Sequence, residues 1–102
     1  MSVQVRIPDE QIADFCHRWK IVRLEIFGSA IRDDFSPTSD IDLLVEYQPG
    51  FHRTVTDMEQ IQVEIEALFS RPVDLITRSS IEHSPNPYKR KNILGQAQVI
   101  YG

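Results

Sequence analysis

The segment from Leu24 to Val45 constrains the fold of this chain more than any other part of it. Apolar residues occupy every second position at both of its ends. They are Val22, Leu24 and Ile26 before the middle of the segment and Ile41, Leu43 and Val45 after it. This period of two predicts a strand over about 22–27 and another over about 40–47. Between them we expect a turn at Gly28-Ser29 and a short helix that ends before Pro37.

Polar residues of this segment point to one kind of chemistry. Asp40 and Asp42 are two residues apart in a predicted strand, so they share one face. Two carboxylates so close together repel each other unless a cation lies between them, which suggests a metal site. Gly28-Ser29, where a strand turns into a helix, offers backbone N–H groups, a hydroxyl and a positive dipole end, which suit a phosphate. The residues alone therefore predict a site for a metal-bound phosphate.

Length and composition limit what surrounds this site. With 102 residues we expect a single domain over 1–102, too small to add a separate substrate-binding domain. The content of 41% hydrophobic and 25% charged residues is typical of globular proteins, and no apolar run is long enough for a membrane span. Cys16, the only cysteine, is expected to be a buried small hydrophobic residue in a cytoplasmic protein without a secretory signal. The net charge of -4 argues against a broad nucleic-acid surface, so no direct nucleic-acid binding is expected.

The remaining helices and strands follow from periodicity. Pro8-Asp9-Glu10 is typical of a helix start, and Thr56 with Glu59 has capping-box spacing for another helix. A third strand is predicted over 73–77, then a helix over 88–96 and a strand over 99–101. The expected buried faces of the first two helices are Ile12, Phe15, Cys16 and Trp19, and Met58, Ile61, Ile65, Leu68 and Phe69. This alternation predicts an α/β sheet covered by helices, with the site at the strand ends and the exposed loop residue His52 at its rim.

Asp74 interrupts the third predicted strand. Val73 and Leu75 share one face of that strand, which leaves Asp74 on the other face with Ile76. One explanation is that this strand lies at the edge of the sheet, where the acid faces water or pairs with an arginine. Beside the Asp40 and Asp42 pair, a third carboxylate of the same site is the favoured interpretation.

The order of these residues matches a known signature. Gly28-Ser29, ten further residues and Asp40-x-Asp42 resemble the Gly-Ser-x10-Asp-x-Asp motif of the DNA polymerase beta-like nucleotidyltransferase superfamily. The small size and the wording around Phe27 and Val45 resemble the minimal nucleotidyltransferases, the MNT family, over nearly the whole chain. The resemblance implies an α/β (α+β) fold, in which a small mixed β-sheet flanked by helices forms a polymerase-beta-like palm core.

The resemblance also implies roles for the carboxylates. Asp40 and Asp42 would hold two Mg2+ ions. Asp74 would bind the catalytic ion and help to deprotonate the attacking hydroxyl. The physical interpretation agrees, because Mg2+ prefers oxygen ligands and paired ions stabilise both the attacking and the leaving oxygen. Attack on the α-phosphate of ATP, with release of pyrophosphate, follows from the resemblance alone.

The phosphate loop departs from the family at two positions. By resemblance, Gly28 and Ser29 would bind the outer phosphates of ATP, with Arg32 assisting. The family often reads Gly-Ser-x-Ala-Arg-Gly, and here Ile31 and Asp33 replace the alanine and the second glycine, while Arg32 is kept.

The family resemblance suggests a function in a toxin-antitoxin pair. Minimal nucleotidyltransferases are typically paired with a HEPN-domain RNase toxin, on which they place AMP at a tyrosine. We therefore expect transfer of AMP from ATP to a protein hydroxyl, by an antitoxin in a hetero-oligomeric complex with such a toxin. Two alternatives stay open. One is a catalytically weak or inactive module that neutralises the toxin by contact, for which Asp33 is a reason. The other is a nucleotidyltransferase acting on a small molecule or RNA.

Overall fold

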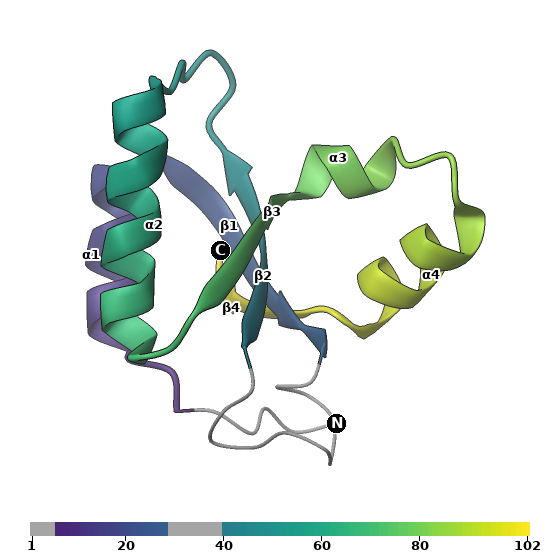
Figure 1. Ribbon diagram of the computed structural model, residues 1–102, viewed down its shortest axis with the longest axis horizontal. Coiled ribbons are helices and arrows are strands. Elements are labelled where there is room, and N and C mark those ends of the chain that lie inside the picture. Colours follow the sequence, from purple (N-terminus) through teal and green to yellow (C-terminus); the bar gives the residue numbers. More distant parts are fainter. Residues whose placement is uncertain (1–5, 29–39) are drawn as a thin grey trace.

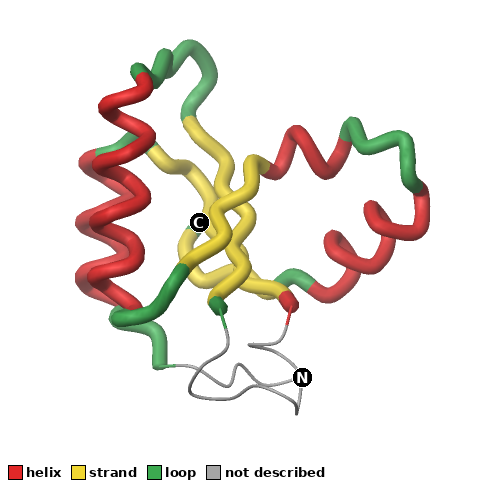
Figure 2. Tube along the Cα trace, in the orientation of Figure 1, coloured by secondary structure: helices red, strands yellow, loops and turns green. Residues whose placement is uncertain are grey.

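A computed structural model describes residues 6–28 and 40–102 of the chain (Figure 1). Figure 2 distinguishes its helices, strands and loops by colour. In chain order they are α1 (Asp9–Arg18), β1 (Ile21–Phe27), β2 (Ile41–Tyr47), α2 (Val55–Phe69), β3 (Val73–Thr77), α3 (Arg78–Glu82), α4 (Pro87–Gln96) and β4 (Gln98–Tyr101). The predicted strands and the first, second and last helices are confirmed. The five-residue helix α3 was not predicted, because it is too short to show a helical period. The helix expected after Ser29 lies outside the described residues.

The described strands form a mixed sheet in the order β3-β2-β1-β4. Strand β1 pairs antiparallel with both β2 and β4, whereas β2 and β3 run parallel. The predicted α/β fold with a small mixed sheet is therefore confirmed. One detail was wrong: Val22 was expected on the apolar face of β1 but is 38% exposed. The β1–β2 register shifts between Ile21 and Arg23, so Ile21 enters the core instead.

One face of the sheet is covered by α1 and α2, which lie side by side to the left of the strands in Figure 1. Every second residue of the central strands faces these helices, as the sequence predicted. The buried residues of this core are Ile12, Phe15, Cys16, Ile21, Leu24, Ile26, Ile41, Leu43, Val45, Ile61, Ile65, Phe69 and Val73. Glu64 of α2 ties the two helices together, because it accepts a hydrogen bond from Trp19 Nε1 at 3.2 Å and pairs with Arg18 Nη1 at 2.8 Å.

The opposite face of the sheet carries α3 and α4, which extend to the right in Figure 1. A smaller buried cluster of Phe27, Leu44 and Ile81 joins these helices to the strands. Ile93 and Leu94 of α4 pack against it and are half-buried. This face is less completely covered than the first, which leaves room for polar groups along it.

The start of α2 differs from the prediction. Thr54, and not Thr56, is the N-cap residue: its hydroxyl accepts from the Asp57 N–H at 3.0 Å, and Asp57 Oδ2 accepts from the Thr54 N–H at 3.0 Å. Thr56 and Glu59 have the same spacing, so sequence alone could not separate the two pairs. Met58, predicted to be buried, is 48% exposed.

None of the helices among the described residues has the length and apolar character needed to cross a membrane.

We predict that Thr54→Ala lowers the free energy of unfolding by about 1 kcal/mol, because the Asp57 N–H loses its acceptor. Thr56→Ala is the matched control and should change stability by less than about 0.5 kcal/mol, since Thr56 is exposed inside the first turn. Urea unfolding followed by circular dichroism measures both. A larger loss for Thr56→Ala than for Thr54→Ala would contradict this assignment of the cap.

Candidate active site

Two of the three predicted carboxylates lie beside each other in the sheet. Asp42 of β2 is the register partner of Asp74 in the parallel strand β3. Register partners in neighbouring strands project from the same face, so the two side chains are adjacent. Asp40 lies immediately before β2, where the Ile41 N–H donates to the Pro72 carbonyl at 3.0 Å. The three acids therefore gather at the end of the sheet where β2 and β3 begin, low in Figure 1.

Gly28, the residue directly after β1, lies beside Asp42. It follows Phe27, the antiparallel register partner of Asp42, and has a positive φ of 75°. A Cβ atom at this position would collide with Asp42 Oδ2, far inside van der Waals contact. Any other residue would force the Asp42 carboxylate to shift and would also adopt an unfavourable positive φ. The predicted importance of Gly28 thus has a physical reason that sequence did not supply.

Other predicted site residues cannot be placed. Ser29 and Arg32 lie outside the described residues, as do Ile31 and Asp33. Their roles at the phosphates of a nucleotide stay predictions. Of the predicted phosphate-binding residues, the structure places only Gly28.

The chemistry of the carboxylates suits a hard cation, although their side chains do not form a closed site. Asp42 is half-buried, whereas Asp40 and Asp74 are exposed. Within residues 6–28 and 40–102, no three acidic, histidine or cysteine side chains are close enough together to hold a metal ion. Adjacent carboxylates, all with oxygen donors, are nevertheless the ligand type that Mg2+ prefers. The backbone places Asp42 and Asp74 together, and the exposed side chains have room to rotate.

Two other candidates are excluded from this site. Cys16 is fully buried, and burial raises the pKa of its thiol to about 12, so it stays protonated near neutral pH. The buried, unreactive role predicted for it is confirmed.

His52 follows the far end of β2, opposite the end that carries Asp42, so its expected place at the rim of the site was wrong.

A buried acid on the same sheet face was missed by sequence reasoning. Glu25 of β1 is only 3% exposed, and its carboxylate accepts a hydrogen bond from Arg78 Nη1 at the start of α3. Arg23 Nε lies 3.3 Å from the same carboxylate. An uncompensated buried charge is costly, so this pairing ties α3 to the sheet. Glu25 could have been found from the sequence, because it is an acid in an otherwise apolar strand, as Asp74 is.

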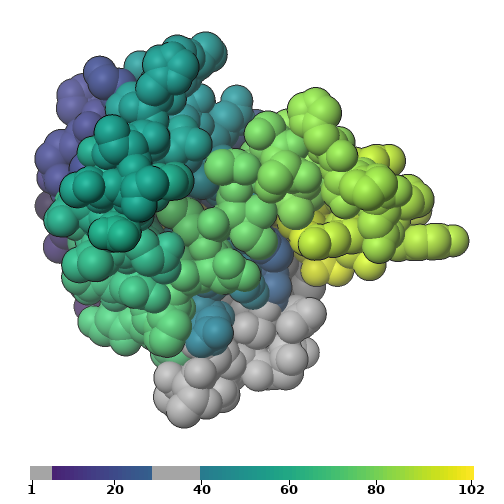
Figure 3. All heavy atoms as spheres, turned by 45° about the horizontal axis from the view of Figure 1, so that its top comes forward, coloured from purple at the N-terminus to yellow at the C-terminus, as the bar shows by residue number. Residues whose placement is uncertain are grey.

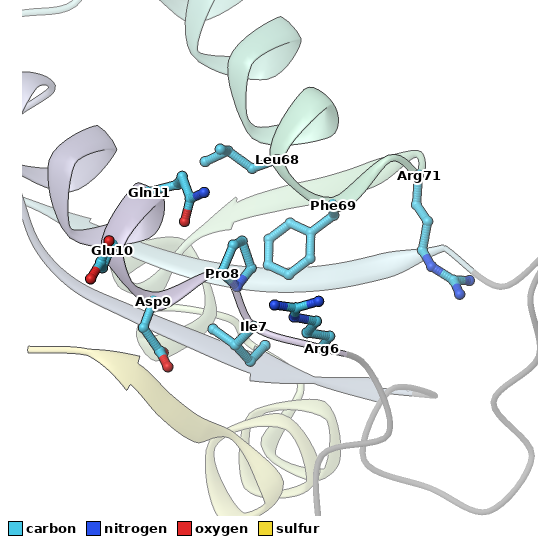
Figure 4. A pocket seen from close by; sticks show the side chains of 9 residues that line it. All are labelled: Arg6, Ile7, Pro8, Asp9, Glu10, Gln11, Leu68, Phe69 and Arg71. Atoms are coloured by element: carbon cyan, nitrogen blue, oxygen red, sulfur yellow. The ribbon is translucent and has the colours of Figure 1, made fainter.

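A cavity among the described residues lies away from these carboxylates. It has a volume of about 940 Å3 and separates the N-terminal end of α1 from the C-terminal end of α2 (Figure 4). Phe69 and Pro8 form its centre, with Arg6 below and Arg71 at one side. Since α1 and α2 cover the opposite sheet face from Asp42, this cavity does not contain the carboxylates. The cavity is therefore separate from the candidate active site.

Comparison with known proteins agrees with this fold. The nucleotidyltransferase domain family matches residues 9–100. A solved structure described as a minimal nucleotidyltransferase is 30% identical, superimposes with a TM-score of 0.65, and is matched over 88% of this chain and 86% of its own. The chain therefore belongs to the nucleotidyltransferase domain family, and it is a nucleotidyltransferase.

Relatives within this family are named more specifically. Two proteins of Methanocaldococcus jannaschii, provisionally named protein adenylyltransferases MJ0435 and MJ0126, are 35% and 36% identical to this chain. The alignments cover 76% of this chain and 76% of the first relative, and 82% and 79% for the second. A crystal structure of a toxin-antitoxin complex with AMP-PNP shares the fold with a TM-score of 0.68 at 16% identity, over 94% of this chain and 74% of that one.

We predict that Gly28→Ala lowers the free energy of unfolding by about 2–3 kcal/mol, because the new methyl group collides with the Asp42 carboxylate in addition to the strain of a positive φ. Gly50→Ala is the matched control: Gly50 has a similar φ of 83° but nothing within 4 Å of its added Cβ. It should cost about 1 kcal/mol, from backbone strain alone. Urea unfolding compares the two, and equal losses would contradict the contact between Gly28 and Asp42.

Proposed function

We propose that this chain is a Mg2+-dependent protein adenylyltransferase, which moves AMP from ATP to a tyrosine hydroxyl of a partner HEPN-domain toxin and so acts as its antitoxin. The observation that supports this most is the register pairing of Asp42 with Asp74 beside Gly28, in a member of the nucleotidyltransferase domain family. The protein acceptor is supported by relatives that are named as protein adenylyltransferases. The toxin partner is supported by toxin-antitoxin complexes that share the fold.

Asp40, Asp42 and Asp74 would hold the metal. Asp42 and Asp74 offer neighbouring oxygen donors, and Asp40 lies two residues before Asp42 in the same chain segment. When bound there, two Mg2+ ions would offset the charge of the phosphates and stabilise the attacking and leaving oxygens. The exposure of Asp40 and Asp74 leaves their side chains open to such a ligand.

The protein's own groups orient the reactants and move the proton. Asp74, the more exposed member of the register pair, accepts the proton of the acceptor hydroxyl. The hydroxyl oxygen forms a bond to the α-phosphorus, and the bond from that phosphorus to the oxygen bridging to the β-phosphate breaks. Pyrophosphate leaves with the electron pair. Gly28 keeps the backbone beside Asp42 clear of side-chain atoms, and Ser29 and Arg32 would bind the outer phosphates.

We predict that Asp42→Asn and Asp74→Asn each reduce AMP transfer on the order of a hundredfold or more, because the charge of a site carboxylate is lost. Asp14→Asn, an equal change at an exposed residue of α1, should leave transfer within about twofold. The assay incubates the chain with MgATP and the protein encoded by the neighbouring reading frame and reads AMP addition by intact mass. Unmodified partner in a competent complex would exclude the transferase proposal.

Neutralisation by contact is the second candidate. It is favoured by Asp33, which replaces the second glycine of the family's Gly-Ser-x-Ala-Arg-Gly pattern. The two candidates predict different outcomes in cells that express the toxin together with the Asp42→Asn variant of this chain. If AMP transfer is required, these cells should die. Survival of those cells at equal protein level would favour contact.

We predict that MgATP at about ten times its Kd raises the melting temperature of the wild-type chain by about 7 °C, from ligand-linked stabilisation of about 1.4 kcal/mol. Asp42→Asn should lose the shift with MgATP, because it removes a carboxylate of the proposed metal site. Scanning fluorimetry measures both. If the free energy of unfolding of the ligand-free Asp42→Asn variant were lower by several kcal/mol, Asp42 would instead have a structural role.

A further inference from the structure

The two edge strands of the described sheet differ in how their outer sides are protected. At β3, Gln62 Nε2 donates to the Val73 carbonyl at 2.6 Å, and the Val73 N–H donates to Glu66 Oε2 at 3.0 Å. Side chains of α2 thus occupy backbone groups that an added strand would need. Asp74 also places a charge on this strand, and charged side chains at an edge disfavour pairing with another chain. The edge formed by β3 is therefore protected.

Strand β4, at the other edge, lacks both kinds of protection. Its sequence, Gln98-Val99-Ile100-Tyr101, contains no charged residue. In the part of the chain that the structure describes, β4 pairs with β1 alone, so an edge strand's row of N–H and C=O groups remains on its outer side. Val99 is 47% exposed, so its side of β4 is not covered by packing either. An uncharged edge of this kind can pair with another strand.

The helix beside this edge has an exposed flank. α1 packs on β1 and β4, whereas α2 packs on β3, and Figure 3 shows α1 in purple at the margin of the molecule beside α2 in teal. His17 and Lys20, at the end of α1 and directly after it, line a hollow together with Tyr101 of β4. Asp9, Ala13 and His17 are exposed and four residues apart, so they form one row along the helix. This row therefore lies on the side of α1 that borders β4.

Antiparallel pairing of two β4 strands would bring two such rows together. Two copies of an edge strand that pair antiparallel are related by a two-fold axis perpendicular to the sheet. Both α1 helices then lie on the same side of the joined sheet, next to the axis, and run in opposite directions. The order of strands becomes β3-β2-β1-β4-β4-β1-β2-β3, which keeps Asp74 at the outer edges and away from the contact.

The row on α1 is complementary in charge to its own copy. It begins with the acid Asp9 and ends with His17, after which Lys20 follows. When the helices are antiparallel, the acidic start of each row faces the basic end of the other, and the helix dipoles also oppose each other. Ala13, in the middle of the row, is small and allows the helices to approach closely. Self-complementarity of this kind is what a two-fold contact requires.

We propose that this chain forms a two-fold homodimer, in which the β4 strands of two copies pair antiparallel and their α1 helices meet through Asp9, Ala13 and His17. The edge of β4 alone would accept any extended segment, whereas the order of charges along α1 selects a second copy. The inference is independent of the proposed function, because neither contact includes the carboxylates of the candidate active site.

Sedimentation equilibrium of the full chain without ATP tests the dimer directly. The register between β1 and β4 shifts next to Leu24, so β4 is bent and the strand contact is short. Because the interface is small, we expect a dissociation constant on the order of 100 µM or below. Hydrogen exchange at the amides of Val99, Ile100 and Tyr101 should slow as protein concentration rises, since paired amides exchange more slowly.

Ala13→Glu should raise the dissociation constant of the dimer about tenfold or more, because it places two carboxylates opposite each other across the axis. Ala67→Glu is the matched control, the same change at an exposed alanine of α2, and should stay within about twofold of wild type. Val99→Lys, which adds a charge to the open edge, should weaken the dimer as Ala13→Glu does. Val63→Lys, at a valine of α2 that is 62% exposed, is its control.

Three outcomes would overturn the inference. The first is a monomer at all concentrations up to about 500 µM, well above the expected dissociation constant. The second is equal weakening by Ala13→Glu and Ala67→Glu, or by the two lysine variants. The third is slowed exchange in β4 that requires the protein encoded by the neighbouring reading frame, which would assign this edge to that partner.

Discussion

The parallel pairing of β2 with β3 is the contact on which the site depends. The Ile41 N–H meets the Pro72 carbonyl at 3.0 Å, and from there Asp42 and Asp74 fall into register. A slip of one residue would turn one of the two acids to the opposite face. The register is held because Val73 and Leu75 pack on the same side of the sheet as Ile41 and Leu43. Burial of the apolar residues on one face of the sheet thus also aligns Asp42 with Asp74 on the other face.

The two faces of the sheet serve different purposes. The face under α1 and α2 is apolar throughout and supplies the main core. The other face combines a small apolar cluster with polar groups, and its Glu25 is compensated by Arg78 and Arg23. That pairing attaches α3, and α4 then packs Ile93 and Leu94 near Phe27, the register partner of Asp42. Packing on this face therefore combines residues of β1, β2, α3 and α4.

The edge position of β3 is consistent with the exposure of Asp74. An exposed acid on an edge strand is compatible with a simple solvent-facing role, so exposure alone does not decide between the two interpretations. Register with Asp42 is the observation that favours a function. Gln62 and Glu66 occupy the backbone C=O and N–H groups of Val73 at the start of the same edge, so strand addition is blocked there.

The sequence by itself determined which residues share a face and which family the chain resembles. Alternation in β1, β2 and β3 predicted the strands closely, and the Gly-Ser and Asp-x-Asp spacing was enough to indicate the nucleotidyltransferase family. Local spacing places a side chain on a face but says nothing about its neighbour across the sheet. Only the tertiary structure decided that Asp74 adjoins Asp42, that Gly28 contacts the Asp42 carboxylate, and that His52 lies at the far end of β2. These relations join residues far apart in the chain, and they follow from strand register and core packing, which no local pattern encodes.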